Sequence, residues 1–260
     1  MNLGLKGKRA LVLSSSRGLG RGIAESLAAE GADVFLTARN ADRLKEAADT
    51  INARGQGRAF YLATSLTGHA EEIHKAAIDA LGHIDILIAN TGGPPPRTAL
   101  NVEIEQWQPN FEAKVMPVIT LAGLVVPGMQ QRKFGRIVTI ASTGVRQPIP
   151  TLVLSNTLRS SLVAWSKTLA TAVAKDGVTV NVALPGRIHT DRVDELDAEN
   201  ARAQGKTVEE IVAEVRAGVP SGRYGRVEEF ADVVCFLASE RASYVTGSTI
   251  AIDGGLIRSL

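Results

Sequence analysis

Short apolar segments alternate along the chain with amphipathic segments of helical period. Seven of them have the character of buried strands: RALVLS (9–14), DVFLTA (33–38), RAFYLAT (58–64), IDILIAN (84–90), GRIVTIAS (135–142), VTVNVALPG (178–186) and STIAIDGG (248–255). Strands this continuously hydrophobic, separated by helical patterns, are typical of a parallel sheet covered on both faces. The pattern predicts an α/β fold of the Rossmann type, with a doubly wound, seven-stranded parallel sheet and helices on both faces.

No Gly/Ser-rich linker or internal repeat interrupts the chain, so we expect residues 1–260 to form a single domain.

One segment departs from the alternation of strands and helices. Residues 191–222 are charged and helix-forming, and they lie between the sixth and seventh strands. Ligands of open α/β sheets bind outside the carboxyl ends of the strands, and an insertion there can close over them. We therefore predict a substrate lid at 191–222, with a solvated helical hairpin as the alternative.

Composition narrows the class of protein. The net charge of +2 is near balance, so we expect neither nucleic acid nor a membrane surface as a partner. The longest uncharged run, VMPVITLAGLVVPGM, contains two prolines and is too short to span a bilayer. Cys235 is the single cysteine and lies among apolar residues, which predicts a buried thiol and a reducing, cytoplasmic setting. No histidine has a cysteine or carboxylate at metal-ligand spacing, so no metal site is expected.

A glycine-containing loop follows the first strand. In SSSRGLG, Gly18 and Gly20 open a helix, where glycines let the backbone approach a pyrophosphate and the helix N-terminus attracts it. The second strand ends at Ala38 and Arg39, where an NAD-binding site would carry an acidic residue. Arg17 lies in the glycine loop, and two guanidinium groups near one ribose favour a 2′-phosphate. The sequence therefore predicts NADP as the cofactor.

These motifs resemble those of the short-chain dehydrogenase/reductase family, closest to its 3-oxoacyl-(acyl-carrier-protein) reductase-like branch, over essentially the whole chain. The family's T-G-x-x-x-G-x-G loop aligns with Leu13 to Gly20, with Ser14 in place of the first glycine, and its N-N-A-G segment aligns with ANTG (89–92). The ending GRYGRVEEFADVVCFLASERASYVTGSTIAIDGG resembles the family's C-terminal signature.

The resemblance implies a set of cofactor contacts and an assembly. Ser65 stands where the family usually has an acidic residue that meets the adenine. The long helices expected at about 103–132 and 152–175 are the usual faces of a homodimer or homotetramer. The implied cofactor-binding residues are Ser14, Ser16, Arg17, Gly18, Leu19, Gly20, Arg39, Ser65, Leu66, Asn90, Gly92, Arg159, Pro185, Gly186, Ile188 and Thr190.

The catalytic set departs from the family pattern of Asn, Ser, Tyr and Lys. Ser142 matches the serine that orients the substrate carbonyl, but the tyrosine site is Ser155, the lysine site is Arg159 and the asparagine site is Lys114. An aliphatic hydroxyl is a much weaker acid than a phenol, so Ser155 is a poor proton donor. Arg159, one helical turn away, stays ionised and cannot relay a proton. Lys114 can donate one if burial lowers its pKa.

The sequence leaves two main functions open, and a third is considered after them. The first is an NADP(H)-dependent oxidoreductase acting on a small-molecule carbonyl/alcohol pair, with an atypical proton donor: Lys114, or water held by Ser142 and Ser155. The second is a dinucleotide-binding protein that no longer transfers hydride and has a sensing or assembly role. A non-redox lyase or isomerase on the same fold is the third.

Loops at the expected catalytic edge carry further polar residues. His189 lies between Gly186 and Thr190, beside the expected nicotinamide, where a substrate contact competes with a surface role. Four arginines in these loops could together receive a carboxylate or a carrier phosphopantetheine. They are Arg97, Arg146, Arg187 and Arg192.

Overall fold

Seven parallel strands form one sheet in the computed structural model, which describes residues 2–259. The strands are β1 (Arg9–Leu13), β2 (Asp33–Ala38), β3 (Ala59–Ala63), β4 (Ile86–Ala89), β5 (Gly135–Ile140), β6 (Val178–Pro185) and β7 (Thr249–Ile252). Their spatial order is β3-β2-β1-β4-β5-β6-β7, so the direction of winding reverses between β1 and β4. The predicted doubly wound α/β fold is confirmed.

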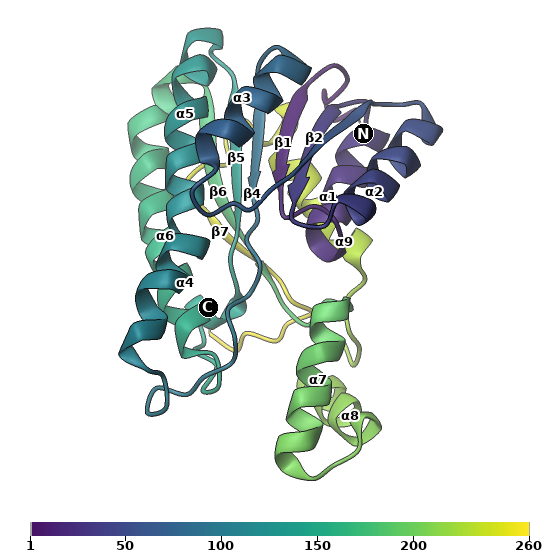
Figure 1. Ribbon diagram of the computed structural model, residues 1–260, viewed down its shortest axis with the longest axis vertical. Coiled ribbons are helices and arrows are strands. Elements are labelled where there is room, and N and C mark those ends of the chain that lie inside the picture. Colours follow the sequence, from purple (N-terminus) through teal and green to yellow (C-terminus); the bar gives the residue numbers. More distant parts are fainter. Residues whose placement is uncertain (1, 260) are drawn as a thin grey trace.

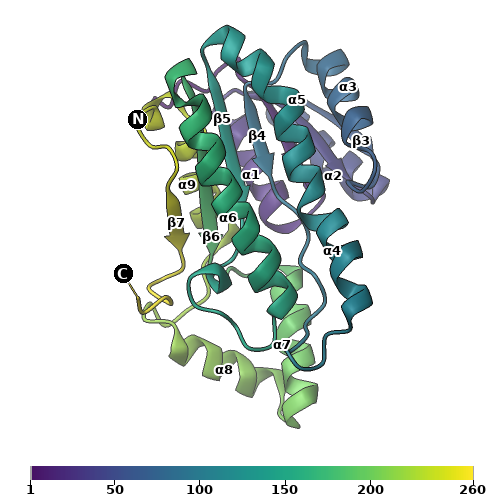
Figure 2. The ribbon, with the colours of Figure 1, turned by 90° about the vertical axis from the view of Figure 1, so that its left-hand side faces the viewer.

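Helices cover both faces of the sheet (Figures 1 and 2). One core contains residues of α1 (Gly18–Ala29), α2 (Ala41–Arg54) and α9 (Val227–Leu237). The opposite core contains residues of α3 (Ala70–Leu81), α5 (Met116–Arg132) and α6 (Val153–Val173). With a core on each side, most residues of β1, β4, β5 and β6 are buried, which explains why their sequences are mainly apolar.

The helix expected at about 103–132 is interrupted. A short 3₁₀ turn (Ile104–Gln106) leads into α4 (Trp107–Lys114), and α5 begins at Met116. Pro117 has no amide hydrogen, so it cannot bond back to the Ala113 carbonyl; in the first turn of α5 that hydrogen is not needed. The break at Val115 places Lys114 at the end of α4, near the carboxyl edge of the sheet.

By length and apolar composition, residues 104–132 also pass as a candidate membrane span, and 33 % of the most apolar stretch is buried. The buried share faces the sheet: Val118, Leu121, Val125 and Met129 of α5 belong to the core shared with α3 and α6. A core helix of this kind meets the same criterion of length and composition as a membrane helix, so the criterion does not distinguish them.

The segment predicted as a lid forms two helices, α7 (Asp191–Gln204) and α8 (Val208–Gly218), beyond the carboxyl ends of the strands (Figure 1). Asp197 of α7 is fully buried and accepts a 2.6 Å hydrogen bond from the Tyr224 hydroxyl. The Arg187 guanidinium lies 3.7 Å from the same carboxylate. These contacts attach the middle of α7 to the loops on either side of the α7–α8 segment.

Candidate active site

A cleft of about 1090 Å³ opens at the carboxyl ends of the central strands, where the winding reverses. It is lined by the loops after β1, β2, β3, β4, β5 and β6, by the first turns of α6 and by one side of α7. Every residue predicted for cofactor binding or catalysis lines this cleft except Gly20. The structure therefore brings together residues from six separate loops.

The glycine loop after β1 has a backbone that explains its sequence. Gly18 has φ +56°, and Ser14 has φ +49°, a conformation that side chains other than glycine rarely adopt. Ser15 fixes the loop, because its hydroxyl donates to the Val12 carbonyl at 2.9 Å and accepts from the Thr37 amide at 3.0 Å. Ser14 thus has the backbone conformation for which the family's glycine is suited.

Gly20, which the family resemblance implies as a cofactor contact, packs against the glycine loop. It does not line the cleft; a Cβ on Gly20 would collide with the Ser14 carbonyl and would lie 2.9 Å from the Asn90 amide nitrogen. The amide of Asn90 donates to the same Ser14 carbonyl at 3.3 Å. Gly20 therefore permits close packing of α1 against the loop, and the cofactor surface is made by the residues before it.

The N-terminus of α1 is open toward the cleft. Arg17 is its N-cap residue and makes no capping hydrogen bond, and the first turn holds no acidic side chain. Gly18 and Leu19 line the cleft beside Thr190, so the free amide groups of this turn face the space between them. Free N–H groups and the positive end of the helix dipole suit a pyrophosphate, so the residues present fit a dinucleotide.

Three arginines line the cleft where a ribose 2′-phosphate is expected. Arg39 is exposed at the end of β2, and Arg43 lies beside it in the first turn of α2. Arg17 is engaged: its guanidinium lies 2.9 Å from Asp191 and 3.3 Å from Glu195, both on α7. Arg43 was not foreseen, although its position in the turn after Asn40, the N-cap of α2, indicates it. The guanidinium cluster is larger than predicted, and part of it holds α7.

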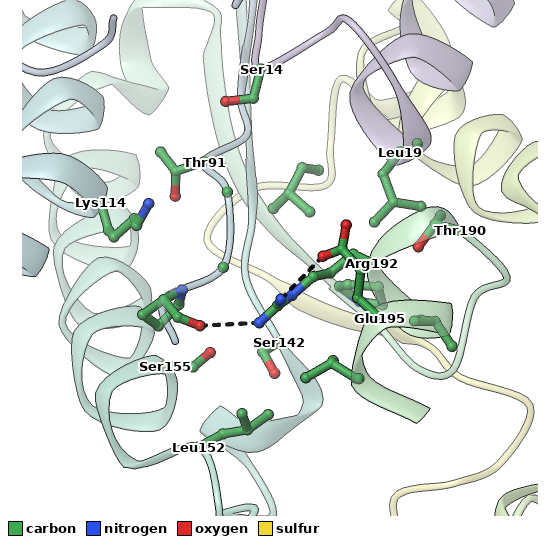
Figure 3. A pocket seen from close by; sticks show the side chains of 18 of the residues that line it. Ser14, Leu19, Thr91, Lys114, Ser142, Leu152, Ser155, Thr190, Arg192 and Glu195 are labelled. Atoms are coloured by element: carbon green, nitrogen blue, oxygen red, sulfur yellow. Dashed lines mark hydrogen bonds and ion pairs between the residues drawn. The ribbon is translucent and has the colours of Figure 1, made fainter. Parts of the chain in front are cut away.

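Ser142 and Ser155 lie on the same side of the cleft, as Figure 3 shows. The Ser142 side chain follows β5 and accepts the Gly144 amide at 3.1 Å, which leaves its own hydroxyl hydrogen free to donate. Helix α6 begins at Val153, so Ser155 lies in its first turn and is only 6 % exposed. Both hydroxyls can donate a hydrogen bond to a carbonyl oxygen in the cleft.

Arg159 has a structural position in the cleft wall. Its guanidinium donates to the Ile140 carbonyl at 2.5 Å and to the Thr91 carbonyl at 2.9 Å. Complete burial lowers the pKa of Arg159 to about 10, so it remains charged at neutral pH. Arg159 thus joins the ends of β4 and β5, and the importance of Thr91 as its partner could not be read from the sequence.

Lys114 reaches the cleft from the end of α4 (Figure 3). Its pKa is lowered first by burial and then by the positive charges of Arg159, Arg39 and Arg192. Among residues 2–259, no carboxylate lies within ion-pair distance of its ammonium group. Lys114 is therefore a cation that can release a proton more readily than an ordinary lysine.

The four loop arginines and His189 divide into two groups. Arg97, Arg187 and Arg192 line the cleft. Arg146 instead donates to the Thr249 carbonyl away from it, so its proposed part in an anion site is wrong. His189 does not line the cleft either; its ring lies 3.2 Å from Asp194.

Comparison with known proteins places this geometry in context. Residues 13–257 match a family model described as enoyl-(acyl carrier protein) reductase. Over 254 residues the chain is 34% identical to the 3-oxoacyl-[acyl-carrier-protein] reductase FabG of Escherichia coli K12, covering 98% of this chain and 99% of that protein. The L-sorbose reductase of Gluconobacter frateurii, solved with NADPH and L-sorbose, is 35% identical, covers 100% of both chains and has a TM-score of 0.94.

A second solved structure shares the cofactor of the first. YwfH, an NADPH dependent reductase involved in bacilysin biosynthesis, has a TM-score of 0.92 at 29% identity, covering 97% of this chain and 99% of its own. The prediction of NADP as the cofactor agrees with the NADPH dependence of YwfH and with the NADPH bound to the L-sorbose reductase.

Proposed function

Because the chain belongs to the short-chain dehydrogenase/reductase family, we propose that it is an NADPH-dependent reductase of a small-molecule carbonyl compound, with Lys114 as the proton donor. The observation that carries this proposal is the position of Lys114. It is a half-buried cation in the cleft, without a carboxylate partner among the described residues, and its pKa is lowered by partial burial and by three neighbouring guanidinium groups.

The residues that would hold the cofactor form a continuous path. The first turn of α1, at Gly18 and Leu19, would bind the pyrophosphate, while Arg39 and Arg43 would bind the 2′-phosphate. The remaining cofactor contacts proposed are Ser14, Ser16, Arg17, Ser65, Leu66, Asn90, Gly92, Arg159, Pro185, Gly186, Ile188 and Thr190.

Bound NADPH supplies a hydride for the carbonyl carbon, and the protein must supply the proton. The hydroxyls of Ser142 and Ser155 donate hydrogen bonds to the carbonyl oxygen and polarise it. The Lys114 ammonium transfers a proton to that oxygen as its negative charge develops, so Lys114 ends as a neutral amine and the product is an alcohol. Arg159 stabilises the same negative charge without releasing a proton, because it stays ionised.

A dinucleotide-binding protein without hydride transfer is the second candidate. It is favoured by the replacement of a phenol by Ser155 and by the engagement of Arg159 with two main-chain carbonyls. The amide-lined turn of α1 and the phosphate-binding arginines serve this function equally well.

Two further features belong to the proposal. Helix α7 forms a wall of the cleft, and we propose that it acts as the lid, whereas α8 contributes no lining residue. The chain assembles as a homodimer or homotetramer through α4, α5 and α6, the faces that the family resemblance implies, and Phe111 of α4 and Met116 of α5 are uncovered in a single chain.

The test combines binding with turnover. Calorimetry with NADPH and NADH measures the cofactor preference, and NADPH oxidation is then followed with a panel of ketones and aldehydes. Turnover that Lys114→Met abolishes supports the reductase. Tight NADPH binding without turnover of any compound in the panel favours the binding protein.

A further inference from the structure

Two of the cations in the cleft meet the same piece of main chain. The segment 91–94 follows β4, and the Arg159 guanidinium donates to its first carbonyl, that of Thr91, at 2.9 Å. The Lys114 ammonium group lies 3.9 Å from the position that a Cβ on Gly92 would take. These cations come from α6 and α4, and the missing side chain at Gly92 leaves space in front of them.

A third cation approaches the next residues of this segment from the lid. The Arg192 side chain extends from α7 into the cleft (Figure 3). Its Nε atom lies 3.7 Å from the Cβ position of Gly93, and its guanidinium donates to the Pro94 carbonyl at 3.3 Å. Three helices therefore bring one positive charge each to four consecutive residues.

These charges are incompletely neutralised. Within the described part of the chain, neither Lys114 nor Arg159 has a carboxylate at ion-pair distance. Arg192 has one acidic partner, Glu195 at 3.3 Å, and Glu195 is shared with Arg17. Of the other two acids that line the cleft, Asp191 pairs with Arg17 and Arg43, and Glu199 lies about two turns beyond Arg192.

The cleft as a whole also carries an excess of positive charge. Its lining contains eight basic residues and three acidic ones. The cofactor's 2′-phosphate and pyrophosphate account for the basic residues near α1 and α2. They do not account for the cations around 91–94, which lie at the catalytic end beside Ser142 and Ser155. A surplus of positive charge in a recessed site attracts and selects anions.

We propose that the substrate is an oxo acid, whose carboxylate is bound by Arg192 while its carbonyl faces Ser142, Ser155 and Lys114. A guanidinium presents paired donors that match a carboxylate, and such bonds are stronger than those to a neutral carbonyl. The present bonds of Arg192 to Pro94 and Glu195 are both 3.3 Å long, so a carboxylate can replace them with shorter ones. The carbonyl chemistry rests on the proposed function, whereas the carboxylate site does not.

The experiment separates binding from turnover. Pyruvate, acetoacetate and 4-oxopentanoate are each compared with their methyl esters, by calorimetry on protein saturated with NADP⁺, where no reduction occurs. The variants are Arg192→Gln, Arg192→Lys and, as a matched control away from the cleft, Arg146→Gln. We expect at least one acid to bind more tightly than its ester, and Arg192→Gln to weaken the acid by about 10- to 100-fold. The ester should change little, Arg192→Lys should recover part of the loss, and the control should match the parent protein.

Each other result overturns the inference. Equal affinity for acids and esters, binding of neither, or a preference for acids that survives Arg192→Gln shows that Arg192 does not bind a carboxylate. If the preference depends on Arg192 but NADPH with the same acids gives no turnover, the carboxylate site stands and the proposed reductase activity fails instead.

Discussion

Proton donation in this cleft depends on a side chain that can lose a proton near neutral pH. Lys114→Met should lower kcat/KM for reduction by about 100-fold or more, because no other described side chain facing Ser142 is a comparable donor. Lys114→Arg keeps the positive charge but not the labile proton, and it should lose about as much. Steady-state kinetics with NADPH and an active carbonyl compound measure both.

The two serines should respond unequally. Ser142→Ala removes a donor to the carbonyl and should cost roughly 100-fold in kcat/KM, whereas Ser155→Ala should leave turnover within about a few-fold. If Ser155→Ala abolishes reduction and Lys114→Met leaves it unchanged, the serine carries or relays the proton.

The pH dependence of reduction follows from the same lysine. The ammonium form is the donor, so activity is full below the pKa of Lys114 and is lost as the pH rises through it. Burial and the charges of Arg159, Arg39 and Arg192 lower this pKa, so the loss should occur below the 10.5 of an ordinary lysine. Alcohol oxidation should show the opposite slope. A profile of log(kcat/KM) against pH tests this, and Lys114→Arg should remove the alkaline decline.

Cofactor preference is decided at the end of β2. Arg39→Asp places a carboxylate against the 2′-phosphate, so NADPH should bind about 10- to 100-fold more weakly while NADH binds at least as well as before. Arg146→Asp, outside the cleft, is the matched control, and calorimetry is the measurement. An unchanged preference for NADPH in Arg39→Asp would mean that Arg17 and Arg43 are sufficient.

Residue types in the site could be predicted better than residue contacts. Both Ser142 and Ser155 line the cleft, as the 13-residue spacing of the family's motif implies. The partners of Arg17 and Arg159 could not be predicted, since Asp191 and the Thr91 carbonyl come from distant loops. The packing of Gly20 against Ser14 could not be predicted, because a glycine required for packing and one required for a ligand look the same in a sequence.

At the scale of elements, α7 and α8 should respond differently to the cofactor. Residues of α7 line the cleft and those of α8 do not, so NADP should slow hydrogen exchange in 191–204 and leave 208–218 unchanged. Exchange followed by mass spectrometry with and without saturating NADP tests this, and α8 is the internal control. Equal protection of both helices would make the whole of 191–222 the lid, and protection of neither would leave the pair a surface hairpin.

Helix boundaries were the least predictable feature of the fold. The sequence predicts a long helix at about 103–132 with a local kink at Pro117, and the structure instead divides it at Val115. A proline in the first turn of a helix is tolerated, whereas one in the interior causes a kink, and the sequence alone does not distinguish these positions. The strands were more predictable because burial on both faces makes most of their residues apolar.

The whole molecule leaves apolar side chains uncovered on the α4–α5 side. Phe111 is 39 % exposed and Met116 is 41 % exposed. We expect a homodimer or homotetramer by light scattering, and Phe111→Glu should shift it toward smaller species, because a charge would be buried in the contact. Tyr244→Glu, at a fully exposed aromatic residue elsewhere, is the control. A parent protein that is monomeric at micromolar concentration contradicts this.

The ion pairs of Arg17 with Asp191 and Glu195 involve the same guanidinium that is proposed to bind the 2′-phosphate. Without cofactor, these acids hold the start of α7 against the glycine loop, and they occupy a guanidinium that a 2′-phosphate also requires. A bound 2′-phosphate would therefore have to displace two carboxylates from Arg17. The free energy gained on cofactor binding would then be smaller than three unpaired arginines would give. When the oxidised cofactor leaves, Asp191 and Glu195 can pair with Arg17 again in place of the phosphate. Helix α7 would thus compete with the 2′-phosphate for Arg17 through side chains of the same chain.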